Sequence, residues 1–238
     1  MIETGNLAVA QCCESKDTVM SSKKDASSVG YALFNDVAQR IVTGNKWQQR
    51  RNLRRNLNRI RGSRESCGRV LDFGCGTGLF ACVFRKLTTH YVGYDIDSRL
   101  TRFASKGRPY AQFTADKQEV TESGPYDLII ANCCFHHIED EILHEELLFI
   151  ADMLKEDGEL LVIDIVKQSE DKKNMFHRVY DHIEQGEHLR MEQHYKEEIE
   201  KVFRIESTSH ERSHTLSIPN PIFYNELLIL RCSKPDPD

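Results

Sequence analysis

Apolar residues recur along this chain at two different spacings, and the change of spacing divides the chain into parts. From residue 31 to residue 60 they recur at every third or fourth position, which predicts amphipathic helix, and Gly44 predicts a break between two helices. Beyond residue 65, short apolar runs alternate with longer mixed segments, a pattern typical of a parallel sheet covered on both faces. Residues 1–28 are polar and have no sustained apolar period, so we expect a flexible tail there.

The alternating part of the chain predicts strands and helices in turn. The expected strands are residues 70–73, 91–94, 111–114, 126–131, 159–165, 204–209 and 223–232. The expected helices lie at residues 78–87, 98–106 and 139–154, and in a charged, histidine-rich stretch from 169 to about 201. This alternation predicts the α/β class.

Length and composition favour one domain with appendages. The 238 residues are enough for one complete α/β domain, and 39% of them are apolar and 29% charged. We expect a flexible tail at residues 1–28, an amino-terminal helical segment at 29–64 and the main domain at 65–234. No apolar run reaches the roughly 18 to 20 residues that cross a bilayer, and the first residues do not resemble a signal peptide. We therefore expect a cytoplasmic protein without a membrane span.

Eight cysteines are spread over the chain without a Cys-x-x-Cys motif. Two adjacent pairs, Cys12–Cys13 and Cys133–Cys134, cannot easily bridge to themselves, so free thiols in a reducing compartment are the simplest interpretation. A zinc site built from either pair and some of the ten histidines would have ligand spacings unlike those of known zinc clusters. We therefore expect no metal site.

The net charge of −5 conceals a basic amino-terminal part. Residues 1–64 contain 12 Lys and Arg against 5 Asp and Glu, which leaves the rest of the chain at −12. Three arginines fall at intervals of four, opposite the apolar face of the second predicted helix: Arg51, Arg55 and Arg59. Such a row can bind phosphates, and it can equally be a solvated helix face. The sequence leaves both interpretations open.

A glycine-rich loop follows the first predicted strand, in the segment Val70-Leu71-Asp72-Phe73-Gly74-Cys75-Gly76-Thr77-Gly78. Glycines let the backbone turn sharply, so a nucleotide-like ligand can lie against main-chain amides at the start of the following helix. A dinucleotide-binding fingerprint would have its third glycine one position later, where this chain has Leu79. The loop therefore predicts a nucleotide-like ligand and disfavours a dehydrogenase.

Polar residues also follow the next three strands. Asp95 ends the second predicted strand, where a carboxylate accepts hydrogen bonds from both hydroxyls of a ribose. Asp116 follows the third strand and can accept from an adenine amino group, or it can cap the next helix. Asn132 ends the fourth strand, where the reactive end of a cofactor would lie. Together these positions predict a cofactor that contains adenosine.

Five segments occur here in the order that they have in class I methyltransferases, and the chain resembles that family over about residues 68 to 166. The segments are residues 70–78, 94–97, 115–116, 127–132 and 154–160. The resemblance implies a Rossmann-like, doubly wound sheet of seven strands, mostly parallel with an antiparallel last strand, preceded here by amino-terminal helices. It also implies S-adenosyl-L-methionine as the cofactor and methyl donor.

The same resemblance implies a set of cofactor-binding residues. In the pattern of the family, the first two glycines line the methionine part and the aspartate before them orients the loop. The end of the second strand binds the ribose, the aspartate after the third strand approaches the adenine, and the residue that ends the fourth strand offers its backbone near the cofactor amino group. In this chain the set is Asp72, Gly74, Gly76, Asp95, Ile96, Asp116 and Asn132.

Histidines mark the side where the methyl acceptor is expected. His136 and His137 follow the fourth strand directly, at the carboxyl edge of the sheet, where doubly wound folds bind their substrates. A base is needed only if the acceptor is a poor nucleophile, and His136 is the candidate for that catalytic task, with His137 as a candidate substrate contact. The alternative is that both histidines cap the following helix or shape the pocket.

A covering segment at about residues 167–201 lies between the fifth and sixth strands. In relatives such an insertion tends to cover the acceptor pocket, which makes three of its residues candidate substrate contacts: His177, Tyr180 and Arg190. The alternative for this segment is a solvated helix with charged faces.

The acceptor itself stays open. We expect a small metabolite, or a sugar- or lipid-linked intermediate, because the covering segment suggests an enclosed pocket. An RNA methyltransferase is the nearest alternative, but the segment Asn132-Cys133-Cys134-Phe135 lacks the prolines of enzymes that methylate base amines, so no nucleic-acid partner is expected. A catalytically idle protein that binds the cofactor and acts as a partner of another protein is a further alternative. The oligomeric state is not predicted.

Overall fold

The computed structural model describes residues 46–63, 65–167, 188–214 and 224–236. The predicted tail, the first of the two amino-terminal helices and most of the covering segment lie outside these residues. Two candidate substrate contacts, His177 and Tyr180, lie outside them as well.

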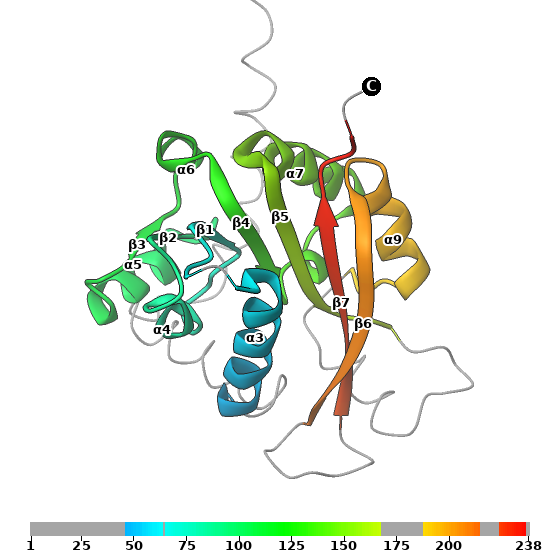
Figure 1. The fold of residues 1–238 in the computed structure, drawn as a ribbon, viewed down its shortest axis with the longest axis horizontal. Coiled ribbons are helices and arrows are strands. Elements are labelled where there is room, and N and C mark those ends of the chain that lie inside the picture. Colours follow the sequence, from blue (N-terminus) through cyan, green and yellow to red (C-terminus); the bar gives the residue numbers. More distant parts are fainter. Residues whose placement is uncertain (1–45, 64, 168–187, 215–223, 237–238) are drawn as a thin grey trace, which may run out of the picture.

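A seven-stranded sheet forms the centre of the molecule, in the order β3-β2-β1-β4-β5-β7-β6 (Figure 1). The strands from β3 to β5 pair in parallel, and β7 is antiparallel to both of its neighbours. The predicted Rossmann-like sheet with an antiparallel last strand is therefore confirmed. The strands are β1 (Arg69–Phe73), β2 (His90–Tyr94), β3 (Gln112–Thr114), β4 (Tyr126–Asn132), β5 (Leu154–Ile165), β6 (Arg204–His214) and β7 (Tyr224–Ser233).

Helices bury their apolar sides on both faces of the sheet. One face packs against α3 and α4, and the other packs against α7 and α9. Strands β1 and β4 and the second half of β5 are almost completely buried because they are covered on both sides. The helices are α3 (Lys46–Arg61), α4 (Ala81–Phe84), α5 (Ser98–Gly107), α6 (Lys117–Ser123), α7 (Asp140–Met153) and α9 (Glu192–Glu200), with a short 3-10 helix η1 (Phe135–His137).

Several elements differ from the prediction, and three of the differences have a local reason. Helix α4 begins after the expected residue 78, because Gly78 has φ +68 and is not helical, and it ends at Phe84, before the expected residue 87. Strand β5 begins at Leu154 instead of 159, since its first residues still pair with β4 across a shift in register. Helix α6 was not predicted, because it buries only Val120 and therefore has no apolar stripe to reveal it.

Helix α3 is an integral part of the domain. Its apolar face is buried on the sheet through Leu53, Leu57 and Ile60, as its spacing predicted. The guanidinium of Arg50 donates two hydrogen bonds, at 3.2 and 2.9 Å, to the carbonyl oxygen of Leu79, just after the glycine loop. Helix α3 therefore packs on the sheet and also fixes the segment that follows the glycine loop.

The opposite side of α3 is polar, as the intervals of four predicted. Arg51, Arg55 and Arg59 are exposed. Arg55 pairs with Glu211 of β6, and the Arg51 guanidinium lies 5.4 Å from the ring centroid of Trp47. These contacts account for two of the three arginines within the protein itself, and phosphate binding by the row stays a prediction from the sequence.

The role of α3 predicts a large loss of stability when its apolar face is truncated. Leu57 is fully buried, so Leu57→Ala should lower the free energy of unfolding by about 2 to 5 kcal/mol in urea titrations. The neighbouring Asn58 is exposed, and Asn58→Ala should change it by less than about 0.5 kcal/mol. An equally small effect of Leu57→Ala would show that α3 does not stabilise the domain.

Candidate functional site

The glycine loop lies at the carboxyl end of β1 and depends on conformations that only glycine adopts readily. Gly74, Gly76 and Gly78 have φ of +72, +52 and +68. A Cβ on Gly74 would lie 2.2 Å from Sγ of Cys134, and one on Gly78 would lie 2.7 Å from the ring of Phe113. The loop therefore needs glycine for its turn and also for its close packing against neighbouring strands.

Asp95, at the end of β2, holds the glycine loop in place. Its Oδ2 accepts a hydrogen bond of 2.8 Å from the Gly76 N–H, and its Oδ1 accepts one of 2.9 Å from the Asp97 N–H. Burial raises the pKa of this carboxyl above its ordinary value, and the two backbone hydrogen bonds oppose that rise. Each carboxylate oxygen has a second lone pair, so Asp95 can still accept from two further donors such as the hydroxyls of a ribose.

The end of β3 lies beside Asp95, because the Asp95 N–H donates to the carbonyl oxygen of Thr114 over 3.2 Å. Asp116 is exposed here and caps α6, with Oδ1 accepting from the Gln118 N–H at 2.8 Å. Helix capping, one of the two roles that the sequence left open for Asp116, is therefore observed. The other role, a contact with adenine, stays a prediction. Ile96 is 84% exposed at the same edge. A flat apolar group such as an adenine ring would cover this side chain.

Asp72 lies beneath the loop and is almost completely buried, with 3% of its surface exposed. Its Oδ2 accepts a hydrogen bond of 2.6 Å from the hydroxyl of Tyr91. Burial raises the pKa of Asp72 to about 7, although the hydrogen bond from Tyr91 acts in the opposite direction. The carboxyl group is therefore close to half protonated at neutral pH.

The loop after β4 borders the glycine loop on its other side. Cys133 has a positive φ of +53, and its N–H donates to the carbonyl oxygen of Ile163 over 2.7 Å. Cys134 contacts Gly74, and Asn132 is half-buried at the end of the strand. Sequence reasoning did not assign Cys134 to the site. Its small side chain, next to a loop that needs close packing, was the only signal.

His136 is buried behind the loop, with 2% of its surface exposed. Its ring Nδ1 contacts Oδ1 of Asp164, and its backbone N–H donates to Oδ2 of the same carboxylate over 3.2 Å. Asp164 is 1% exposed; burial alone would raise its pKa, but the charge and hydrogen bond of His136 lower it below its ordinary value. The pair joins η1 to the end of β5.

His137 reaches the surface beside the buried histidine. The centroids of the His136 and His137 rings are 4.0 Å apart. Desolvation by the surrounding protein, followed by repulsion from His136, lowers the pKa of His137 to about 4. The His137 ring is therefore neutral at physiological pH and can accept or donate a hydrogen bond.

The Arg190 side chain is bound by groups of the protein itself. It is 4% exposed, and its guanidinium donates to the carboxylate of Asp140 at 2.6 Å and to the carbonyl oxygens of Phe135, at 2.8 Å, and Ile138. These contacts fasten η1 and the start of α7. The substrate contact expected of Arg190 from the sequence stays a prediction.

The described part of the chain contains no group of three His, Cys, Asp or Glu residues placed to hold a metal ion. Its cysteines are all free thiols. Within the same ranges, no helix is long and apolar enough to cross a membrane.

Comparison with protein families identifies the domain. Residues 45–204 match a family described as a methyltransferase domain. An uncharacterized methyltransferase of Staphylococcus carnosus is 24% identical over 128 residues, which are 54% of this chain and 61% of that protein. One of Mycobacterium bovis is 33% identical over 76 residues, which are 30% of this chain and 38% of that protein. The chain therefore spans less than two thirds of the length of these curated relatives.

Solved structures have the same fold. A SAM-dependent methyltransferase from Archaeoglobus fulgidus superposes with a TM-score of 0.59 at 18% identity, over 86% of this chain and 99% of that one. The N-methyltransferase NodS from Bradyrhizobium japonicum gives a TM-score of 0.56 at 14% identity, over 78% and 96% of the two chains. The family match over residues 45–204 and the order of the seven strands show that the chain belongs to the class I, S-adenosylmethionine-dependent methyltransferases.

Proposed function

We propose that this methyltransferase acts on a small acceptor, either a free metabolite or a sugar- or lipid-linked intermediate, bound beside η1 at the carboxyl edge of the sheet. One observation carries the position of the acceptor: the loop after β4 touches the glycine loop, through the contact between Cys134 and Gly74. The segment that leads to His137 therefore begins next to the cofactor loop, so an acceptor bound there lies near the methyl group.

The residues of the site fit S-adenosylmethionine. Gly74 and Gly76 leave the loop backbone open to the methionine part, Asp95 keeps acceptor capacity for the ribose, and Ile96 offers an exposed apolar side chain to the adenine. We propose Asn132 as the backbone contact of the cofactor amino group. When bound, the cofactor supplies a methyl group on a positively charged sulfur that is already a good leaving group, so the protein contributes mainly alignment and exclusion of water.

The histidines take different tasks in this proposal. His136 is buried and paired with Asp164, so we assign it a positioning role instead of the catalytic one expected from the sequence. His137 is exposed and neutral, so it can bind the acceptor without adding a second positive charge beside the sulfonium. A ring with a pKa of about 4 is a weak base, which favours an acceptor that is itself nucleophilic over an unactivated hydroxyl.

The class of acceptor can be tested with S-adenosylmethionine carrying a radioactive methyl group. Incubated with an extract of the cells that produce the protein, the enzyme should transfer label to the fraction of small molecules or to that of lipids. His137→Ala should lower the rate at least about 10-fold, because an acceptor contact is lost. Label in the RNA or protein fraction would contradict the proposed acceptor class. Unchanged transfer by His137→Ala would contradict the role of His137.

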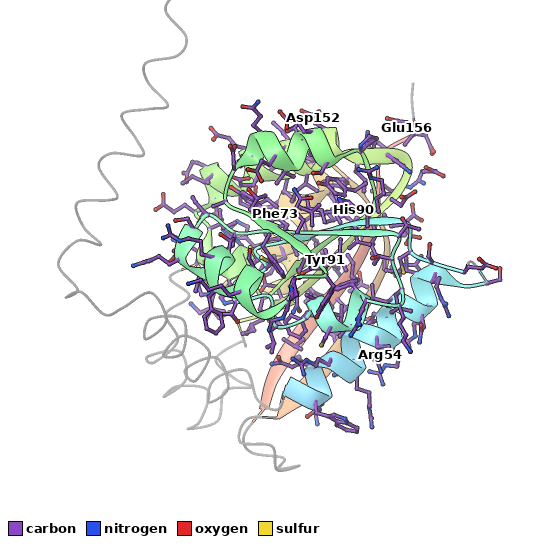
Figure 2. All side chains as sticks on the ribbon, turned by 90° about the vertical axis from the view of Figure 1, so that its left-hand side faces the viewer. Arg54, Phe73, His90, Tyr91, Asp152 and Glu156 are labelled. Carbon is purple, nitrogen blue, oxygen red and sulfur yellow. The ribbon has the colours of Figure 1, made fainter. Side chains whose placement is uncertain are left out.

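The role of Asp95 can be tested by calorimetry with S-adenosylhomocysteine, the product of the cofactor. Asp95→Asn removes a charged acceptor of hydrogen bonds, so the affinity should fall at least about 10-fold. Asp152→Asn removes an exposed carboxylate of α7, away from the loop, and serves as the matched control (Figure 2). Equal affinities of both variants, or tight binding of a nicotinamide nucleotide in place of the product, would contradict the assignment.

The buried carboxyl beneath the loop predicts an unusual pH dependence of stability. Because the pKa of Asp72 is about 7 in the folded protein and 3.8 when unperturbed, the folded state binds the proton more tightly, and stability falls as the pH rises between these values. Asp72→Asn cannot ionise at this position and does not lose stability in this way. The free energy of unfolding of the variant minus that of the original protein should therefore rise by about 2 to 3 kcal/mol between about pH 5 and pH 8. Urea unfolding at both pH values measures it. A difference that is independent of pH would show that Asp72 ionises normally.

A further inference from the structure

A cavity of about 600 Å³ lies at the edge of the sheet opposite to the glycine loop. It is formed where β2 and β3 begin, and its polar lining comes from Arg85, Thr88, Thr89, His90, Tyr110 and Gln112. Two residues of this lining, His90 and Tyr91, are labelled in Figure 2. The volume is in the range of small-molecule sites.

The lining of this cavity contains no acidic residue, although the chain as a whole has 37 Asp and Glu residues and a net charge of −5. The guanidinium of Arg85 lies 5.1 Å from the ring centroid of Tyr110, and within the described ranges it has no carboxylate partner. The cavity therefore offers a cation that is not neutralised, two hydroxyl groups and an aromatic ring.

This donor set suits one class of ligand. A phosphate group is bound well by a guanidinium together with hydroxyl donors. Here Arg85 supplies the guanidinium, and Thr88 and Thr89, which follow it closely in the chain, supply the hydroxyl groups. The ring of Tyr110 is 45% exposed and can stack against a flat heterocycle. A phosphate monoester that carries such a ring, as a nucleoside monophosphate does, uses both features at once.

The cavity is connected to the cofactor site through a side chain that serves both. Tyr91 lines the cavity, and its hydroxyl donates to Asp72 beneath the glycine loop over 2.6 Å. Its ring centroid lies 5.8 Å from that of Phe113, which in turn packs against Gly78 of the loop. A ligand that shifts Tyr91 therefore acts on the packing of the loop that binds the cofactor.

We propose that this cavity binds a nucleoside monophosphate or a similar ring-bearing phosphate ester, and that its occupation changes the affinity for the cofactor. The site is separate from the one that holds S-adenosylmethionine. Because coupling between two sites is reciprocal, the cofactor must change the affinity for the phosphate ester by the same factor.

The proposal can be tested by calorimetry with adenosine monophosphate on the full chain. The adenosine moiety could enter the cofactor site, so the protein is first saturated with S-adenosylhomocysteine. Adenosine monophosphate should still bind, more tightly than inorganic phosphate or adenosine alone. Arg85→Gln should weaken binding at least about 10-fold, since a hydrogen-bonded charge is lost. Arg102→Gln removes an exposed arginine of α5 that lines no part of the cavity, and it should bind as the original protein does.

The coupling has its own readout. The affinity for S-adenosylhomocysteine should change by a factor of about five or more when adenosine monophosphate is present, and Arg85→Gln should abolish that change without altering the affinity measured alone. Binding that disappears when the cofactor site is filled, or no binding of adenosine monophosphate or phosphate at all, would overturn the proposal. Failure of S-adenosylhomocysteine itself to bind would instead overturn the cofactor site, so the two results are distinguishable.

Discussion

The hydrogen bond from the Gly76 N–H to the Asp95 carboxylate is the contact on which the site depends. It joins the loop after β1 to the end of β2, at the carboxyl edge of two adjacent parallel strands. On the other side, Gly74 packs against Cys134 and so joins the same loop to β4. Contacts from both neighbours of β1 thus fix the backbone conformation of the loop before a ligand binds.

Three carboxyl groups lie along this edge, those of Asp72 and Asp164 buried and that of Asp95 half-buried, and their pKa values are shifted by different surroundings. The pKa of Asp72 is raised by burial, that of Asp95 is raised against two backbone hydrogen bonds, and that of Asp164 is lowered by His136. Beside them, desolvation keeps the His137 ring neutral. In the cofactor position that we propose, a positively charged sulfonium would lie near carboxyl groups and a neutral ring, so electrostatic repulsion from the site would be small.

The features of the fold that depend on local sequence pattern could be predicted from the sequence. The apolar runs predicted the strands, and the positions of Gly74, Gly76 and Asp95 after them followed from motif order. What depends on contacts far apart in the chain was not predictable. The ring of His136 contacts Asp164, 28 positions later, and the guanidinium of Arg190 donates to Asp140, 50 positions earlier; neither contact was expected from the sequence.

The most direct test of the cofactor site is a crystal structure of the full chain with S-adenosylhomocysteine. We expect the ribose hydroxyls within hydrogen-bond distance of the Asp95 carboxylate, the adenine ring against Ile96, and the sulfur near the loop after β4 that leads to His137. The hydrogen bond from Gly76 to Asp95 should persist, since the carboxylate has lone pairs for both. Product bound elsewhere, or with its ribose away from Asp95, would contradict the assignment.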